Sequence, residues 1–319
     1  MRKSNTYTSV TNAFAYDPKT MYSHDTIWCM TWFVYAVLSA FLSSISSILE
    51  KKTLGNMHAI DFSAALALGT GLLSLPILLL SSWVSITPFV LCVIFVIALL
   101  ASFAFIGVTR GVRHMDISTS SPLFLLSPFM TAFLAFCMLG EKFSSLQLGG
   151  IIFLALGIYV LETKHFWRFG EFLANIWGDK YTRFILFGLL LYALTSVGDR
   201  IMLAYWHVPP PLYTALIQLF IALHMLILTW YYRGSVVRPL ELVGRHWKNI
   251  FLIAIFTTAY RIFQSEAIAL AAVGLVAAVK RSSTLFTTII GGELFHDEGL
   301  LRKSIACFIM IIGVYLIAT

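Results

Sequence analysis

The sequence predicts an all-α membrane protein in which ten transmembrane helices form two inverted five-helix repeats. Hydrophobic residues make up 59% of the 319 residues and charged residues only 12%, which is more apolar surface than a soluble protein of this length can bury. The apolar residues fall into blocks about twenty residues long, enough for a helix to cross roughly 30 Å of hydrocarbon. The two halves of the chain also end in similar segments, which is typical of membrane proteins built from internal repeats.

Ten apolar blocks are predicted to be helices, because none shows the period-two alternation of a transmembrane β-strand. The first repeat covers residues 27–162 and the second covers residues 182–319. Residues 1–26 form a polar N-terminal tail without the apolar core of a secretory signal, and residues 163–181 form a linker expected in the headgroup zone. The expected spans are 27–49, 62–81, 88–107, 117–138, 146–161, 184–205, 212–232, 250–271, 273–294 and 302–318.

Prolines predict where spans bend or begin. Pro122 and Pro128 lie inside the fourth span and are expected to kink it, because proline lacks a backbone donor. The run Pro209-Pro210-Pro211 ends the sixth span and begins the seventh, where a missing donor does no harm.

The fifth and tenth spans close on similar segments, Gly-Ile-Tyr-Val-Leu at residues 157–161 and Gly-Val-Tyr-Leu-Ile at residues 313–317. Five spans per repeat is an odd number, so the two halves must enter the membrane in opposite senses. Loop charge agrees, because Lys51 and Lys52 follow span one while no Lys or Arg stands at the matching place after span six. Aligned on these endings, Ser127 matches Ser283, Thr131 matches Thr287, and the turn Gly140-Glu141-Lys142 matches His296-Asp297-Glu298.

Short motifs recur at matching places in both repeats. The first repeat contains Ser120-Ser121-Pro122-Leu123, Leu126-Ser127-Pro128, Leu139-Gly140-Glu141-Lys142, Gln147 and Gly150 before its closing segment. The second contains Lys280-Arg281-Ser282-Ser283, Gly291-Gly292 and the turn 295–298. These motifs resemble the EamA-type halves of the drug/metabolite transporter superfamily, and the resemblance covers nearly everything after residue 26. It implies a ten-helix carrier with a central pathway between the repeats, working by alternating access.

The orientation of the chain stays open at this point. Members of the superfamily generally keep both termini in the cytoplasm, whereas the positive-inside rule applied to this chain puts the termini outside. The bases responsible follow odd-numbered spans and include Lys164, Arg168, Lys180, Arg302 and Lys303.

Basic side chains inside the predicted spans are candidates for binding an anionic substrate. An ionisable group deep in a span costs roughly 2.5–3.5 kcal/mol on insertion scales, so it normally faces a cavity or a partner. Lys280 and Arg281 lie in span nine where the first repeat has Phe124 and Leu125, so only one repeat carries this charge. The pair is also similar to the phosphate-binding pair of the plastid phosphate translocators of the same superfamily. The candidate substrate-binding residues are Tyr260, Arg261, Gln264, Lys280, Arg281 and Thr284.

Acidic side chains in the second repeat allow a different role. Asp199, Glu266 and Glu293 are candidates for proton coupling, because a desolvated carboxylate can bind and release a proton during transport. The alternative is that these acids pair with the bases of spans eight and nine and serve only to hold helices together. Arg200, next to Asp199, favours a permanent ion pair there.

A polar stripe on span one has two interpretations. Ser39, Ser43, Ser46 and Glu50 share one helical face. Close helix packing is the favoured explanation, because small hydroxylated residues commonly join helices in lipid, and lining of the pathway is the alternative.

Other kinds of site are not predicted. The four cysteines and eight histidines lack ligand spacing, and no nucleophile or phosphate-loop motif is present, so we expect no metal, no cofactor and no enzymatic activity. The net charge of +7 lies mostly in loops and is explained by lipid headgroups rather than nucleic acid.

The sequence therefore predicts a secondary transporter, a carrier or exporter of a small organic metabolite, with an anionic one favoured. We expect an integral multi-pass protein of the cell (inner) membrane, monomeric or homodimeric, whose partners are its small-molecule substrate and membrane lipid. One alternative is a proton-coupled exporter of drugs or amino acids. A second is a membrane scaffold or sensor that transports nothing.

Overall fold

The computed structural model describes residues 26–54, 59–81, 83, 86–114, 123–124, 126–162, 180–287, 290 and 300–318. Every regular element within these ranges is helical, which confirms the predicted all-α class. The predicted tail and linker fall outside the described residues except at their last positions.

Five described helices of the first repeat each overlap one predicted span. The third begins at Pro88, whose missing backbone donor suits a first helical position. Pro128, predicted to kink the fourth span, lies in the first turn of its helix, where the backbone N–H needs no partner. These helices are α2 (Thr26–Leu54), α3 (Ala59–Leu80), α4 (Pro88–His114), α6 (Leu126–Leu139) and α7 (Ser145–Glu162).

The second repeat follows the same order. The sixth predicted span is α9 continued by a π-helical turn, η3, and Pro210 begins the next helix as its position in the sequence predicts. Extended backbone at Ala271 separates the eighth helix from the ninth. The elements are α9 (Lys180–Arg200), η3 (Ile201–Tyr205), α10 (Pro210–Arg233), α12 (Trp247–Leu270), α13 (Val273–Arg281) and α15 (Leu300–Ala318).

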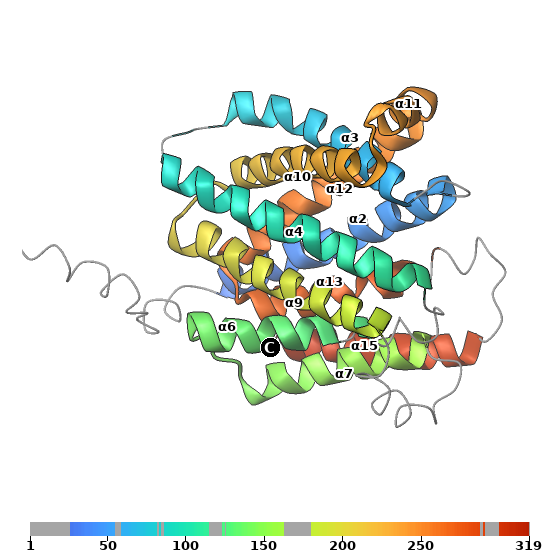
Figure 1. Ribbon diagram of the computed structural model, residues 1–319. Coiled ribbons are helices and arrows are strands. Elements are labelled where there is room, and N and C mark those ends of the chain that lie inside the picture. Colours follow the sequence, from blue (N-terminus) through green and yellow to red (C-terminus); the bar gives the residue numbers. More distant parts are fainter. Residues whose placement is uncertain are drawn as a thin grey trace, which may run out of the picture.

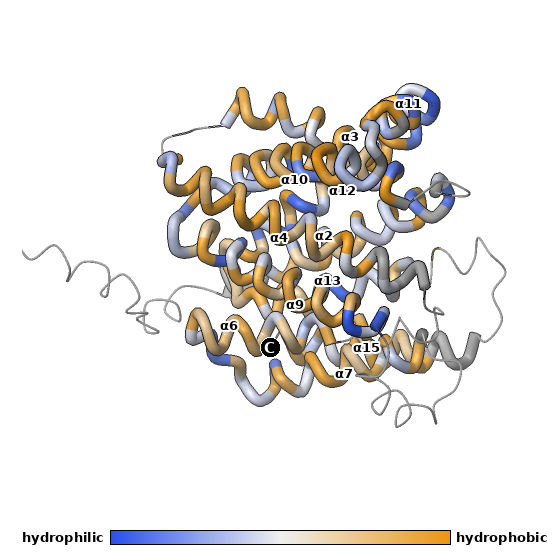
Figure 2. Tube along the Cα trace, viewed as in Figure 1, coloured by the Kyte–Doolittle hydropathy of each residue, from blue (hydrophilic) through white to orange (hydrophobic). Residues whose placement is uncertain are grey.

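A short helix that the sequence analysis did not predict, α11 (Val237–Arg245), lies between α10 and α12. Val237 and Leu240 on it are more than half exposed, and Glu241 and Arg245 are exposed beside them. Figure 2 shows the polar residues of α11 at the edge of the molecule, away from the apolar helices. An amphipathic helix in this place suits the boundary between lipid headgroups and acyl chains.

Five of the described helices are long and apolar enough to cross a membrane, namely α2, α3, α4, α9 with η3, and α10. Three shorter apolar helices lie at Leu126–Leu139, Ser145–Leu161 and Ile305–Ala318. Large apolar side chains on these helices, such as Leu79, Phe133 and Phe308, are exposed, as expected where a protein surface contacts lipid.

The main helix contacts join one repeat to the other. The closest pairs are α7 with α15, α4 with α9, α2 with α12 and α3 with α10, and Figure 1 shows α7 alongside α15 and α3 close to α10. In repeat order, α2 corresponds to α9, α3 to α10, α4 to α12, α6 to α13 and α7 to α15. When each helix is exchanged for its counterpart, the pair α4 and α9 becomes the pair α12 and α2. The pairs α3 with α10 and α7 with α15 stay the same. The repeats are therefore interleaved about a pseudo-two-fold axis.

Glycines at the α7 and α15 contact show how that axis is oriented. A Cβ on Gly157 would lie 2.9 Å from the Met310 nitrogen and 3.0 Å from the Ala306 oxygen. A Cβ on Gly313 would lie 2.5 Å from the Leu154 nitrogen and 2.8 Å from the Gly150 oxygen, which are the repeat-equivalent positions. The two helices are antiparallel, so the axis that relates them is perpendicular to both. This is the geometry of an inverted repeat.

Candidate functional site

A cavity of about 590 Å³ lies between the two repeats. Helices α2, α3 and α4 of the first repeat and α9, α10 and α12 of the second line it. Its apolar wall includes Phe62, Phe105 and Met225. Its main polar groups are Glu50, Tyr192, Gln218, Thr257, Tyr260 and Arg261.

The cavity lies toward one end of the helices. Its lining residues come from the last part of α2, the first part of α3 and the middle of α9, α10 and α12. We call this end, where α2 ends and α3 begins, the α2–α3 end. The opposite end, where α12 ends and α13 begins, is the α12–α13 end. The cavity therefore extends from the centre of the protein to the α2–α3 end.

Four of the six predicted substrate-binding residues are close together on α12 and α13. The Lys280 Nζ lies 4.8 Å from the centre of the Tyr260 ring and donates a hydrogen bond of 2.5 Å to Gln264 Oε1. The Arg261 guanidinium carbon is 5.9 Å from the same ring centre. Both cations are thus within the range of cation–π attraction. Tyr260 and Arg261 line the cavity, whereas Lys280 contacts Tyr260 and Gln264 accepts a hydrogen bond from Lys280.

The other two predicted residues are Arg281, which ends α13, and Thr284, three positions after it. The Arg281 guanidinium carbon is 5.9 Å from the Phe124 ring centre, on the first repeat. The Thr284 hydroxyl donates a 2.5 Å hydrogen bond to the carbonyl of Arg281, the last residue of α13. Neither lines the cavity between the repeats.

The candidate acid Asp199 has a different partner from the one expected from the sequence. The Tyr213 hydroxyl donates a hydrogen bond to Asp199 Oδ1, while the Arg200 side chain bonds to Glu141. The neighbouring ion pair between Asp199 and Arg200, expected from the sequence, is therefore not formed. Glu266 is partly exposed near the end of α12. Glu293 lies outside the described residues.

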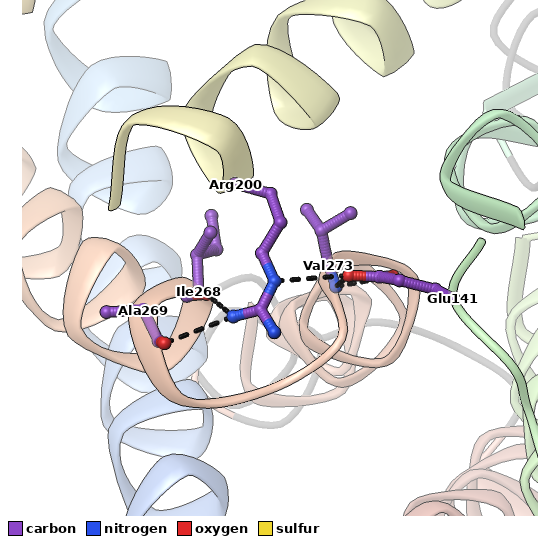
Figure 3. A network of polar contacts seen from close by, with 5 residues as sticks. All are labelled: Glu141, Arg200, Ile268, Ala269 and Val273. Carbon is purple, nitrogen blue, oxygen red and sulfur yellow. Dashed lines mark hydrogen bonds and ion pairs between the residues drawn. The ribbon is translucent and has the colours of Figure 1, made fainter. Parts of the chain in front are cut away.

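Glu141 and Arg200 join the two repeats at the α12–α13 end, as Figure 3 shows. Arg200 Nε donates to Glu141 Oε1 over 3.2 Å, and both side chains are 8% exposed. The Val273 backbone N–H donates to the two Glu141 oxygens over 3.2 and 3.1 Å. Arg200 Nη1 donates to the carbonyl of Ile268 and, over 3.1 Å, to that of Ala269. We call this network the Glu141–Arg200 clamp.

The clamp supplies partners for two helix ends. Glu141 accepts from the first N–H of α13, where the helix dipole favours a negative charge. Arg200 donates to the last carbonyls of α12, where a positive charge is favoured. Burial raises the pKa of the Glu141 carboxyl, and the Arg200 guanidinium and the Val273 N–H act against that rise.

From the sequence, Glu141 was identified only as a turn residue, and its role in the clamp was not predicted. The available signal was an acid directly after Gly140, whose φ of 68° lies in the left-handed region and ends α6. Glu50 was recognised only as part of the polar stripe of span one. Within that stripe Ser39 donates to the Tyr260 carbonyl over 2.9 Å and Ser46 contacts the Thr257 hydroxyl at 2.8 Å, so both pack α2 against α12.

Comparison with known proteins decides the family. The sequence model of the EamA-like transporter family matches residues 30–163 and again residues 181–319. This chain belongs to the EamA-like transporter family. The resemblance predicted from the motifs is confirmed, and each matched segment overlaps five of the ten predicted spans. The protein is therefore a multi-pass integral membrane protein of a transporter family.

Solved structures agree on the fold. One that is described only as the crystal structure of a protein superposes on this EamA-like chain with a TM-score of 0.70 at 15% identity. The superposition covers 90% of this chain and 96% of the other. No curated protein matches the sequence.

Proposed function

We propose that this EamA-like transporter is a secondary carrier of the cell membrane that moves a small organic solute with an anionic group by alternating access. The observation that supports this most is Arg261, a cationic side chain in the wall of a cavity lined by both repeats. Among the described residues Arg261 has no ion pair. Its guanidinium can therefore donate two parallel hydrogen bonds to a carboxylate or another oxyanion.

Lys280 acts in this proposal as a positioning residue. Its ammonium contacts the Tyr260 ring and Gln264, so it holds Tyr260 in place beside Arg261 and adds positive potential to the cavity. Arg281 and Thr284 do not line the cavity, so the proposal gives them no direct contact with the solute.

The test is uptake into proteoliposomes of labelled organic acids, such as gluconate, that are too polar to cross lipid unaided. The wild-type protein should carry at least one of them faster than empty liposomes do. Arg261→Gln should lower that rate tenfold or more, because the anionic group loses its charged partner. Lys280→Ala should lower it less, and Arg245→Gln, an exposed position on α11, should leave it unchanged.

Three results would overturn the proposal. Equal uptake by wild type and Arg261→Gln would show that Arg261 does not bind the anionic group. Uptake of cationic solutes alone would favour the drug exporter, and uptake of nothing from a panel of anions, cations and neutral solutes would favour the scaffold.

A further inference from the structure

We propose that Glu50 makes the cavity selective for amphoteric solutes, those that have one anionic group and one cationic or strongly donating group. This inference rests on the proposed function and names the class of solute that the same cavity takes. Its physical basis is a pair of opposite charges that line one cavity and, among the described residues, do not form an ion pair with each other.

Glu50 and Arg261 line the cavity from facing helices of different repeats. Among the described residues no ion pair joins them, and the ion pair between Arg200 and Glu141 is separate from both. Asp199 and Glu50 attract the Arg261 guanidinium without forming an ion pair with it, so each cavity-lining charge can still take a direct partner from the solute. A solute that brings both signs of charge can satisfy both.

The position of Glu50 is fixed by its neighbours. Ser46, one turn earlier on α2, donates to Glu50 Oε1 over 2.9 Å and contacts the Thr257 hydroxyl on α12 at 2.8 Å. Arg261 is one turn after Thr257. The helices α2 and α12 are antiparallel here. Relative to the contact between Ser46 and Thr257, Glu50 therefore lies nearer the α2–α3 end, and the backbone of Arg261 lies deeper in the protein. The solute would thus place its anionic group inward and its cationic group toward the opening.

Gln218 adds a donor at the deep part of the cavity. This side chain is 4% exposed, its Oε1 accepts from the Thr258 hydroxyl over 3.1 Å, and its Nε2 has no partner in the protein. A buried donor without an acceptor is destabilising, so an acceptor on the bound solute is expected here. The amide can share the anionic group with Arg261.

The same arrangement selects against other solutes. A dianion would place its second negative charge near Glu50 and meet repulsion. A simple cation can pair with Glu50 but brings no anionic group to Arg261. A simple monoanion leaves Glu50 unpaired. The apolar wall of Phe62, Phe105 and Met225 suits a hydrocarbon body between the charged ends, and about 590 Å³ is ample space for it.

The experiment measures binding of four six-carbon probes to the purified full-length protein by isothermal titration calorimetry. The probes are 6-aminohexanoate, hexanoate, hexylamine and adipate, which share a hydrocarbon body and differ only in their end groups. Wild type should bind 6-aminohexanoate at least tenfold more tightly than any of the other three. Glu50→Gln should bring 6-aminohexanoate and hexanoate to within about threefold of each other, because the ammonium loses its partner.

The matched control is Glu241→Gln on the exposed face of α11, which should keep the wild-type order of affinities. Thermal unfolding of each variant checks that the fold is retained. Adipate binding as tightly as 6-aminohexanoate, a preference that survives in Glu50→Gln, or no binding of any probe at millimolar concentration would each overturn the inference. Gluconate uptake that depends on Arg261 would in those cases still support the proposed function, so the two can fail separately.

Discussion

Single residues in this protein act through the partner that the fold gives them. Arg200 follows Asp199 in the chain, yet it bonds to Glu141, fifty-nine positions away, because α9 directs successive side chains to different faces. Asp199 instead accepts a hydrogen bond from Tyr213. Arg261 and Glu50 face the cavity without pairing, and this distinguishes them from the buried ion pair of the clamp.

Removing one member of the clamp should be worse than removing both. Arg200→Met leaves the Glu141 charge buried with one backbone partner, so we expect a loss of about 3–5 kcal/mol in the free energy of unfolding. Arg200→Met combined with Glu141→Gln should lose clearly less, because no uncompensated charge remains. Unfolding in a denaturing detergent measures both, with Arg183→Met, an exposed residue of α9, as the control. A double variant less stable than Arg200→Met would contradict this account.

At the scale of elements, packing of the fifth and tenth helices depends on small residues. Gly150, Gly157 and Gly313 let the backbones of α7 and α15 approach so closely that a Cβ would contact main-chain atoms. Without a hydrophobic driving force between helices in lipid, such close contact is a main source of their association. The closing segments that reveal the repeat in the sequence are thus the segments that hold the two repeats together.

Replacement of one of these glycines should separate the helices. Gly157→Ala places a Cβ 2.9 Å from the Met310 nitrogen, and we expect a loss of about 1–3 kcal/mol from overpacking. Gly149→Ala has nothing within 4 Å of its Cβ and should be neutral or slightly stabilising, because alanine favours helix more than glycine does. Thermal unfolding of the two variants in one detergent compares them. Equal stability would show that the contact is loose enough to accommodate a methyl group.

At the scale of the whole molecule, the two ends of the helices differ. The cavity extends to the α2–α3 end, whereas the Glu141–Arg200 clamp connects α6, α9, α12 and α13 at the α12–α13 end. In a carrier with inverted repeats, exchange of the two conformations opens one end as it closes the other. In the alternating-access carrier proposed above, the clamp is the contact that would break for the cavity to open at the α12–α13 end.

Accessibility of a cavity residue should report this exchange. In a variant without the native cysteines, Ile221→Cys on the cavity wall should react quickly with a membrane-impermeant maleimide added from the α2–α3 side. Reaction from the α12–α13 side should be slow, and it should rise several-fold when Glu141→Gln is added, because a charge-assisted hydrogen bond is lost. Glu241→Gln should not change it. No increase with Glu141→Gln would show that the clamp does not control opening at that end.

Much of this architecture followed from the sequence because its causes are local. Apolar length determines a membrane helix, Pro210 and Gly140 mark helix ends through their backbone restrictions, and the doubled closing segments with an odd number of spans require inversion. The cluster of Tyr260, Arg261, Gln264 and Lys280 was also predictable, since helical spacing places the first three on adjoining faces of α12.

The tertiary structure alone decided which charges meet and which face the cavity. Glu141 bonds to Arg200 and Val273 because α6, α9 and α13 converge at one end of the bundle, and nothing in their separate sequences indicates that convergence. Glu50 and Arg261 face one cavity because α2 packs antiparallel to α12 across the repeats. Helix formation and membrane insertion depend on each segment by itself, whereas pairing and selectivity depend on distances between segments, which only the packed molecule determines.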